Sequence, residues 1–588
     1  SSSETKKSKK DNEVSSLFSE KMYSAYVKSA FESLEKNDPI QINTLTSKIN
    51  LPKSHHEAIP LSSFITVLKI LISNISRLDN SYCSSLVSSI LHYDWLLAKS
   101  SSEEEYLLFI ELYAQFLSVL VSSLPKYLFE VTNKIIGEFI DLKLEGTALP
   151  HHKVLDKLRR FIPTCVNSFP TIIHKNFPHH LSTNSTELSQ YVGNIMKMIS
   201  YCPELQFNIW QMIIECCIKL DVELQNELDD LDDDEIEELI NGNDDEEAEE
   251  NEEVEEDEDD VIEGEVEYLM DQTTSTANIK SLVFKLDSVI NLLLTNTKNS
   301  FTTEELNNGN GVTLFNTITS LFKSHILPTH FTKSIQFTLF HISQYQPELA
   351  DSFLVLLIDI AFNPNEILEK RLKAMQYLSS YIARAKNLSR HQVVFIVSYL
   401  IGWLNKYVIE REAEVYDLDN NSDKSTGGME RFKLFYAAFQ ALLYIFCFRY
   451  KLLYKVDGSD EQQPKSSNDS EWECDLDKFF QRAILAKFNP LKFCDETVVY
   501  IFAKIATKLN VCYCYSIIEH NKRETMIQSN SSMPLSIGNF KLKQEFLDLE
   551  AYFPFDPIVL PNCKKIVNEN YVEWSDVNPN DDEDDEDD

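Results

Sequence analysis

Apolar residues recur at helical spacing along most of the 588-residue chain. After Ile279 they follow the i, i+3, i+4, i+7 rhythm that places side chains on one stripe of a helix. This stripe consists of Leu282, Val283, Leu286, Val289, Ile290 and Leu293. A second run follows Ser102 and Glu105, which have the spacing of an N-terminal capping box. Alternation of apolar and polar residues over the length of a strand is scarce, so the pattern predicts an all-α protein.

Prolines separate these helical runs, for example at Pro125, Pro163 and Pro328. Helices repeated through so long a chain do not fit one compact bundle, whereas stacked helix pairs bury their stripes on one another at any length. We therefore predict a HEAT-like helical-repeat superhelix (α-solenoid) with a disordered acidic insertion and an acidic C-terminal tail. The prediction rests on periodicity, because the sequence shows no repeating motif.

Residues 430–449 are apolar on every side of the helix they would form, which is typical of a helix buried between layers. The longest apolar stretch, residues 435–448, is shorter than the ~20 residues needed to cross a bilayer. The sequence therefore predicts no membrane partner.

Acidic residues are concentrated in two segments. The net charge is −39, and residues 221–271 carry 29 acidic residues and no basic one, while residues 573–588 carry another 10. The rest of the chain is neutral. Acidic runs with few large apolar residues cannot offset the entropy of folding. The predicted organisation is a disordered basic tail (1–12), an N-terminal helical-repeat part (13–220), an acidic disordered loop (221–275), a C-terminal helical-repeat part (276–572) and an acidic tail (573–588).

The sequence contains little evidence for a catalytic site or a cofactor site. The chain has 12 glycines and no phosphate-binding glycine pattern, which argues against a nucleotide-binding enzyme. Its 11 cysteines include no CxxC pair and are predicted to be reduced core residues. The histidine doublets, including His151 and His152, lack metal-ligand spacing and are assigned to surface loops. We predict no enzyme activity, no catalytic residue, no cofactor and no metal.

A basic cluster lies in one predicted helical pair and is interpreted as a solvated face rather than a nucleic-acid site, because the acidic segments oppose phosphate binding. It consists of Lys370, Arg371, Lys373, Arg384, Lys386 and Arg390. No strong direct DNA binding is expected.

Serine gives the most specific signal. Residues 62–123 contain 15 serines, and five of them, spaced i, i+3, i+4, i+7, i+8, are predicted to share one face of a helix. These five are Ser81, Ser84, Ser85, Ser88 and Ser89. One interpretation is a neutral solvent-facing surface. The other is a docking surface with little side-chain entropy to lose, which a phosphate of about −1.5 to −2 charge would disrupt. Ser73, Ser122 and Ser123 on adjacent predicted helices extend it.

Several long blocks resemble a known family. They are residues 314–337 (LFNTITSLFKSHILPTHFTKSIQF), 427–449 (GGMERFKLFYAAFQALLYIFCFR), 477–494 (DKFFQRAILAKFNPLKFC) and 552–557 (YFPFDP). Together with residues 221–234 they are similar to the RNA polymerase I-specific transcription initiation factors, the growth-regulated factors of the yeast type. The resemblance runs in order from about Met22 to Ser575.

The resemblance implies a HEAT-like superhelix without catalytic activity, located in the nucleus and nucleolus. It also implies that the chain binds RNA polymerase I near its stalk and bridges it to the promoter-bound core factor for ribosomal RNA synthesis. Family members are regulated by phosphorylation, and a serine-containing patch in their N-terminal half faces the polymerase. The matching positions here are Ser73, Ser81, Ser122 and Ser123, whereas Ile72 and Asn80 stand where paired serines are expected.

The predicted polymerase-binding and phosphoregulatory surface therefore comprises Ser73, Ser81, Ser84, Ser85, Ser88, Ser89, Ser122 and Ser123. Self-association as a homodimer is left open. The alternative function is a HEAT-like nuclear scaffold, such as a transport adaptor or a histone-binding protein, that uses its acidic segments to attract basic tails.

Overall fold

The computed structural model describes residues 20–98, 100–143, 146–241, 263–420, 428–455, 470–530 and 549–579. In these ranges the chain is built from helices, as predicted, and the only β-pairings are two isolated bridges, Ala385 with Tyr571 and Tyr454 with Trp472. The chain divides into two compact units, Ser1–Ile213 and Ile214–Asp588, and the helix α10 (Gln206–Leu228) contains the boundary.

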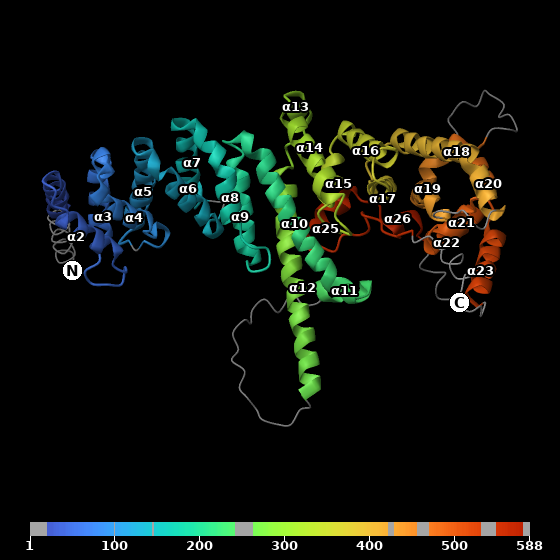
Figure 1. Ribbon diagram of the computed structural model, residues 1–588, viewed down its shortest axis with the longest axis horizontal. Helices are drawn as coiled ribbons and strands as arrows, with labels where there is room; N and C mark the ends of the chain where they lie inside the picture. The colour runs from blue at the N-terminus through green and yellow to red at the C-terminus, as the bar shows by residue number, and fades with distance from the viewer. Residues whose placement is uncertain are drawn as a thin grey trace, which may run out of the picture. The chain divides into compact units, whose positions relative to one another are not determined.

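The first unit opens with a helix over residues 20–35. Its other α-helices are α2 (Ile40–Asn50), α3 (Leu61–Ser73), α4 (Ser84–Leu91), α5 (Glu103–Ser123), α6 (Leu128–Gly137), α7 (Leu149–Phe161), α8 (Phe169–Asn176) and α9 (Ser185–Met198) (Figure 1). Alternate helices pack on one another: α5 contacts α3 and α7, while α6 contacts α4 and α8. Two parallel layers result, which is the packing expected of HEAT-like helix pairs.

The second unit begins with α11 (Asp233–Asn241), α12 (Glu263–Asn296), α13 (Thr303–Asn307), α14 (Asn310–Leu321), α15 (Phe337–Ser343) and α16 (Pro347–Ala361). It continues with α17 (Leu368–Arg384), α18 (Arg390–Asn420), α19 (Lys433–Leu453), α20 (Leu476–Ala483), α21 (Pro490–Phe493), α22 (Glu496–Lys508), α23 (Tyr515–Asn530), α25 (Pro561–Val567) and α26 (Trp574–Val577). The helix α19 packs against α17, α18 and α22.

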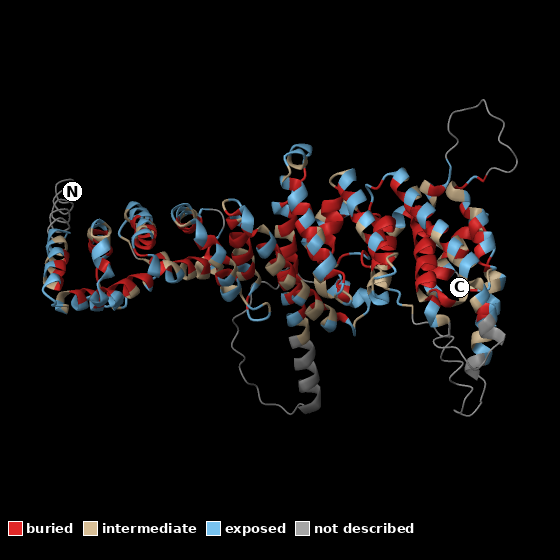
Figure 2. Cartoon of the chain, turned by 45° about the horizontal axis from the view of Figure 1, so that its top comes forward, coloured by how far each residue is buried: buried red, intermediate tan, exposed pale blue. Residues whose placement is uncertain are grey.

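The burial of α19 confirms the prediction for residues 430–449. Every residue from Leu434 to Arg449 is buried. In Figure 2 the buried positions follow the faces along which successive helices of each unit meet.

Helix ends follow the sequence signals in part. The Ser102 side chain accepts a hydrogen bond from the Glu105 N–H at 3.2 Å and so begins α5. The Glu105 carboxylate bonds the Ser101 hydroxyl instead of the Ser102 N–H, so only half of the predicted capping box forms. Asn184 and Asp495 cap α9 and α22 in the same way as Ser102.

Part of the predicted acidic loop is helical. Residues up to 228 continue α10, α11 covers Asp233–Asn241, and α12 begins at Glu263. The reason lies in Leu224, Leu228 and Ile236, which are buried at helical spacing among the acids. Residues 242–262 of the loop lie outside the described residues.

The predicted acidic C-terminal tail is also helical in part. Residues 574–577 of the acidic tail form α26, and Val577 is buried. The helix α26 packs against α19, so this part of the tail belongs to the second unit. Residues 1–12 and 580–588 lie outside the described residues.

Three described helices are long and apolar enough to cross a membrane by length and composition: Glu103–Ser123, Arg390–Tyr416 and Met429–Leu453. The prediction that no segment reaches that length is therefore wrong. In the third helix 89% of the most apolar window is buried among other helices, so protein packing accounts for its composition.

Candidate functional site

The serines predicted to form a surface lie where three helices of the first unit meet. The 3₁₀ turn η1 (Ile75–Asp79) packs against α3, α4 and α5. Ser73 ends α3, Ser81 opens the 3₁₀ turn η2 (Ser81–Cys83) before α4, and Ser122 and Ser123 end α5. Serines far apart in sequence are thereby brought to one junction.

A salt bridge ties this junction together. The Lys126 ammonium, just after α5, lies 2.7 Å from the Asp79 carboxylate, two residues before Ser81. Both side chains are more than half exposed, so the pair orients the two segments more than it stabilises them. A second exposed pair, Arg77 with Glu35 at 3.5 Å, also balances local charge.

Exposure separates the predicted serines. Six of them are exposed and Ser88 is half-buried, and these seven form the serine surface: Ser73, Ser81, Ser84, Ser85, Ser88, Ser122 and Ser123. Ser89 is only 8% exposed, and its hydroxyl donates to the Ser85 carbonyl at 2.8 Å. The prediction that Ser89 faces solvent is wrong, because α4 begins only at Ser84 and Ser89 lies one helical turn after the buried Leu86, on the side where α4 meets the core.

The hydroxyls of the serine surface donate within their own segments. Ser73 donates to the Lys69 carbonyl at 3.1 Å, and Ser122 donates to the Ser118 carbonyl at 2.9 Å. Ser84 donates to the Ser81 carbonyl at 2.9 Å. Since each oxygen still has a lone pair that can accept, the surface offers small acceptors with few rotamers to restrict.

An aromatic side chain that the serine spacing did not point to also belongs to this surface. Tyr82 lies between Ser81 and Cys83 and is 46% exposed, whereas Cys83 is buried. The Asn80 side chain accepts a hydrogen bond from the Tyr82 N–H at 3.1 Å, which fixes the turn. Partly exposed tyrosines are frequent anchors in protein interfaces. The sequence signal that could have identified Tyr82 is its position as an aromatic residue within a run of serines.

The histidine doublet at 151–152 lies inside the first unit and not in a surface loop. The His151 Nε2 lies 2.7 Å from the Glu138 carboxylate, which also accepts from the Trp95 Nε1–H at 2.8 Å. Burial raises the pKa of the Glu138 carboxyl. The hydrogen bonds and charges of His151 and Lys134 have a larger opposite effect, so the pKa lies below its usual value. The assignment to a surface loop is wrong because α7 begins at Leu149, so both histidines fall on its buried face.

His152 belongs to a second buried network. Its Nε2–H donates to the Asn194 side-chain oxygen at 3.1 Å, and its Nδ1 accepts from the Tyr201 hydroxyl at 2.6 Å. The Asn194 amide in turn donates to the carbonyls of Phe139 and Leu142. Burial lowers the pKa of His152 to about 4, so the ring is neutral at pH 7 and acts as a structural tie.

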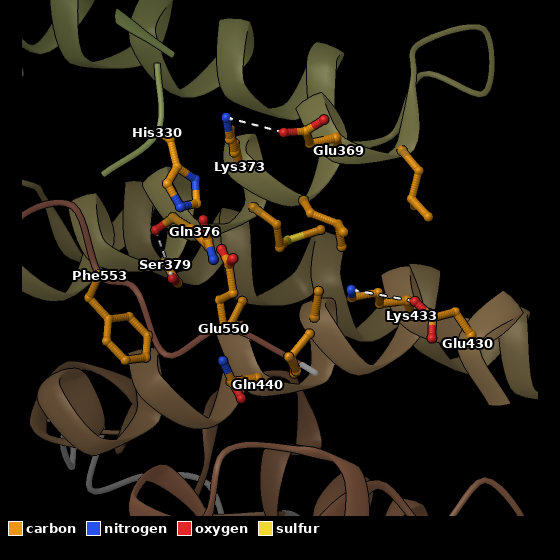
Figure 3. A pocket seen from close by; sticks show the side chains of 16 residues that line it. His330, Glu369, Lys373, Gln376, Ser379, Glu430, Lys433, Gln440, Glu550 and Phe553 are labelled. Carbon is orange, nitrogen blue, oxygen red and sulfur yellow. Dashed lines mark hydrogen bonds and ion pairs between the residues drawn. The ribbon is translucent and has the colours of Figure 1, made fainter. Parts of the chain in front are cut away.

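A cavity of about 320 Å³ lies between α17, α19 and the segment around residues 549–553 of the second unit. Figure 3 shows two ion pairs in the lining, Lys373 with Glu369 at 3.6 Å and Lys433 with Glu430 at 3.6 Å, and a further carboxylate, Glu550. The Lys373 ammonium also donates to the Pro328 carbonyl at 2.8 Å. Both lysines are therefore already paired within the protein, and Glu550 leaves the lining with one excess negative charge, so no lysine remains to select an anionic ligand.

The predicted basic cluster does not form a solvated face. Arg384 is buried and donates to the Val572 carbonyl at 3.0 Å, and Arg371 donates to the Ala361 carbonyl at 3.0 Å. Arg390 donates to the Tyr454 carbonyl. Long basic side chains here tie helices to neighbouring segments, and the acceptors Ala361 and Tyr454 lie at the C-terminal ends of α16 and α19, where carbonyls lack partners within the helix.

The cysteines confirm the prediction of reduced core residues. All eleven are free thiols, ten are buried and Cys474 is half-buried. Burial raises the pKa of the Cys83 thiol to about 11 and that of the Cys202 thiol to about 12. In the described part of the chain, no group of three or more His, Cys, Asp or Glu residues could hold a metal ion.

Comparison with known proteins identifies the family. Residues 16–579 match the family described as "RNA polymerase I specific transcription initiation factor RRN3". The chain belongs to the RRN3 family.

Relatives of the RRN3 family agree with this assignment. The chain is 42% identical to the RNA polymerase I-specific transcription initiation factor RRN3 of Saccharomyces cerevisiae, over 95% of this chain and 91% of the relative. It is 27% identical to the Schizosaccharomyces pombe factor, over 89% of this chain and 81% of the relative. The crystal structure titled RNA Polymerase I Transcription Initiation Factor Rrn3 matches with a TM-score of 0.77 and 42% identity, over 95% of this chain and 99% of that one.

RRN3 family membership confirms the resemblance found in the sequence and the helical-repeat fold. The family consists of transcription initiation factors and is not described as enzymatic. It favours the initiation-factor hypothesis over the transport or histone-binding scaffold.

Proposed function

We propose that the chain acts in the nucleus, at the nucleolus, as an initiation factor that binds RNA polymerase I near its stalk and bridges it to the promoter-bound core factor. Binding would occur without catalysis or a cofactor. Membership of the RRN3 family supports the polymerase as the partner, since a relative matched over 91% of its length is named an RNA polymerase I-specific factor.

The observation that carries the polymerase-binding assignment is the serine surface. Six exposed serines and Tyr82 meet at the junction of α3, η1, η2, α4 and the end of α5. Short hydroxyl side chains allow a partner backbone to approach closely, while a half-exposed tyrosine supplies apolar contact area. Such a surface suits a protein partner better than a nucleic acid, because its ion pairs are internally balanced.

Phosphorylation would act on this surface through local charge. Ser122 and Ser123 end α5, where the helix dipole is negative, so a phosphate there is unfavourable and competes with Asp79 for Lys126. Ser84 and Ser85 begin α4, where a phosphate is favourable for the helix. In both places the added charge would have to be desolvated on docking, which weakens binding.

Core-factor contact is assigned to the second unit. The helix α18 exposes Phe395 (54%), Tyr399 (40%) and Ile409 (82%) along one side. Large apolar side chains exposed on one helix mark an interaction surface. Assigning the polymerase and the core factor to different units gives each partner a surface of its own, as bridging requires.

The experiment compares two triple variants in a polymerase I pull-down. Ser81→Asp with Ser84→Asp and Ser85→Asp charges the serine surface, whereas Ser200→Asp with Ser281→Asp and Ser352→Asp adds the same charge at exposed serines elsewhere. We expect the first variant to bind at least about ten-fold more weakly and the second to bind normally, since a buried unpaired charge costs several kcal/mol. Equal binding of both variants would remove the serine surface from the proposal.

A further inference from the structure

The second unit contains a separate cavity of about 390 Å³, walled by α17, α19, α22, α26 and the segment 551–556. Its walls are mainly apolar and include Phe448, Val498, Phe553 and Trp574. Arg384 and Tyr444 also face this cavity, which is open to solvent on one side. No residue of the serine surface lines it, so a ligand bound in this cavity is independent of the proposed function.

The Arg384 guanidinium is buried with part of its hydrogen-bonding capacity unused. Its side chain is 7% exposed and lies over the Phe448 ring, 4.3 Å from the ring centre. The Nη1 donates to the Val572 carbonyl at 3.0 Å, whereas Nε has no hydrogen-bond partner among the described residues. The Nη2 lies 3.6 Å from the carboxylate of Asp556, whose side chain is 57% exposed.

A buried guanidinium normally has paired donors, because an unpaired buried charge is costly. Nε and Nη2 form one edge of the planar group, and this edge can donate two parallel hydrogen bonds to one carboxylate. In Arg384 the Val572 carbonyl accepts from Nη1 only, so it does not use the edge formed by Nε and Nη2. Asp556 is too exposed and too distant to satisfy it fully, so an incoming carboxylate can replace it.

Tyr444 adds another donor and a flat apolar wall. Its ring stacks on Phe553 with centroids 4.0 Å apart and planes within 4°. Its hydroxyl oxygen lies within reach of the Arg384 guanidinium, which can only donate to it, and its own O–H finds no acceptor among the described residues. The residue is 7% exposed, so the hydroxyl donates to a ligand or remains unsatisfied.

The chain's own segment shows which side chains this region accepts. Phe553 covers the Tyr444 ring, and Asp556, three residues later, approaches Arg384. An acidic residue close to a bulky apolar residue is therefore already present at the edge of the cavity. The other acidic residue of the lining, Asp495, caps α22 by accepting from the Val498 N–H at 3.1 Å, so the positive end of that helix offsets its charge.

We infer that this cavity binds an acidic peptide segment of a partner protein. A Glu or Asp carboxylate of the peptide pairs with Nε and Nη2 of Arg384 and accepts from the Tyr444 hydroxyl. A neighbouring apolar side chain of the peptide fills the space between Phe448, Val498 and Trp574. A peptide fits better than a free metabolite, because Phe553 and Asp556 of the chain itself already place an aromatic ring and a carboxylate together at this lining.

Binding is measured by fluorescence anisotropy on the full chain, with two labelled probes. One is acetyl-Gly-Trp-Glu-Leu-Gly-amide, and the other has Gln in place of Glu and so keeps the shape without the charge. The Glu probe should bind at least ten-fold more tightly. Arg384→Lys, which keeps the charge and loses the planar edge, should reduce that preference to less than three-fold.

Because Arg384 is buried, its replacement risks unfolding the second unit, so a second variant blocks the cavity from its rim. Ala551 is exposed and lines the cavity. Ala551→Trp should weaken the Glu probe at least ten-fold with an unchanged circular dichroism spectrum. Ala413→Trp, at an exposed position of α18, is the matched control and should bind like the wild type.

Three results with the peptide probes would overturn the inference. They are equal binding of the Glu and Gln probes, undiminished binding to Ala551→Trp, and no binding at millimolar probe. Indole-3-propionate serves as a free carboxylate of similar chemistry. If it binds as tightly as the Glu probe, the site takes small carboxylates, and the assignment to a peptide is wrong.

Discussion

The Asp221 carboxylate accepts a hydrogen bond of 2.9 Å from the backbone N–H of Ser334, 113 residues further along the chain. The N–H groups of Lys333 and Ile335 donate to the same carboxylate at 3.2 and 3.0 Å. Asp221 therefore fixes the turn after Phe331, a residue held at φ 54°. An acidic residue at the start of an acidic run thus serves as a buried tie within the second unit.

The buried Asp221 should give the second unit a distinctive pH dependence. Burial raises the pKa of its carboxyl to about 6 from an ordinary 3.8, and the three N–H groups only partly oppose this. Because the folded pKa lies above the unfolded one, this group's stabilisation is fully present below about pH 4 and falls as the pH rises through 6. The loss amounts to about 3 kcal/mol.

Asp221→Asn keeps the shape but cannot titrate, so it tests this prediction. Between pH 4 and 6 the wild type should lose stability relative to Asp221→Asn, measured by urea unfolding at each pH. Asp230→Asn, at an exposed position near the end of the same region, controls for charge alone. Parallel pH profiles for the wild type and Asp221→Asn would contradict the buried titration.

His152 should give the first unit the opposite response. Burial lowers its pKa to about 4 from 6.5, so the unfolded chain takes up a proton that the folded ring refuses. Stability is lost as the pH falls from about 6.5 to 4, by roughly 3 kcal/mol. Hydrogen exchange on the full chain, corrected for intrinsic rates, should show α7 and α9 opening more easily towards pH 4.5. His152→Gln should flatten that trend, and an unchanged trend would assign it to other groups.

Asp287 should be a second structural carboxylate. It is 3% exposed and accepts from the N–H groups of Asn562 and Cys563 at 3.0 and 2.9 Å, so it caps α25 from another helix. Asp287→Ala leaves those amides unpaired and should lower the free energy of unfolding by about 2–4 kcal/mol. Asp359→Ala, at an exposed site on α16, should change it by under about 0.5 kcal/mol. Chemical denaturation of both variants compares them directly.

Two neighbouring serines should respond differently to a negative charge. Ser89 is buried, so Ser89→Asp places a charge in the first unit's core and should destabilise it by about 3 kcal/mol. Ser85 is exposed in the first turn of α4, so Ser85→Asp should leave the stability unchanged or raise it by about 0.3–1 kcal/mol. Thermal unfolding followed by circular dichroism measures both. Similar melting temperatures would mean that Ser89 is not part of the core.

The parts of this fold that follow from local periodicity were predictable. The stripe from Leu282 to Leu293 is buried along α12, and the all-round apolar run around Phe439 is the buried α19. Local composition gave the wrong expectation for residues whose burial depends on contacts with distant parts of the chain. Asp221 counts as one more acid in an acidic run until the turn at Ser334 folds onto it.

The serine surface was likewise predictable only in part from the sequence. The spacing of Ser81, Ser84 and Ser85 predicted a shared exposed face, but the predicted face was too wide, because it included Ser89, which α4 turns towards the core. The cavity at Arg384 was beyond the reach of sequence patterns, because its walls come from α17, α19, α22 and the C-terminal segment. Arg384 was grouped with nearby basic residues, and nothing local marks it as buried.

The position of the C-terminal segment has a consequence for how the chain folds during synthesis. Residues 549–577 supply Pro554 to Gln336 and Cys563 to Asp287, contacts that join positions 218 and 276 residues apart. Until residues 549–577 have left the ribosome, α12, α15 and α17 lack part of their core. The second unit should therefore complete its folding only after this segment has been synthesised, whereas the first unit can fold while the chain still emerges. A stop codon just before residue 549 would therefore leave α12, α15 and α17 without these packing partners.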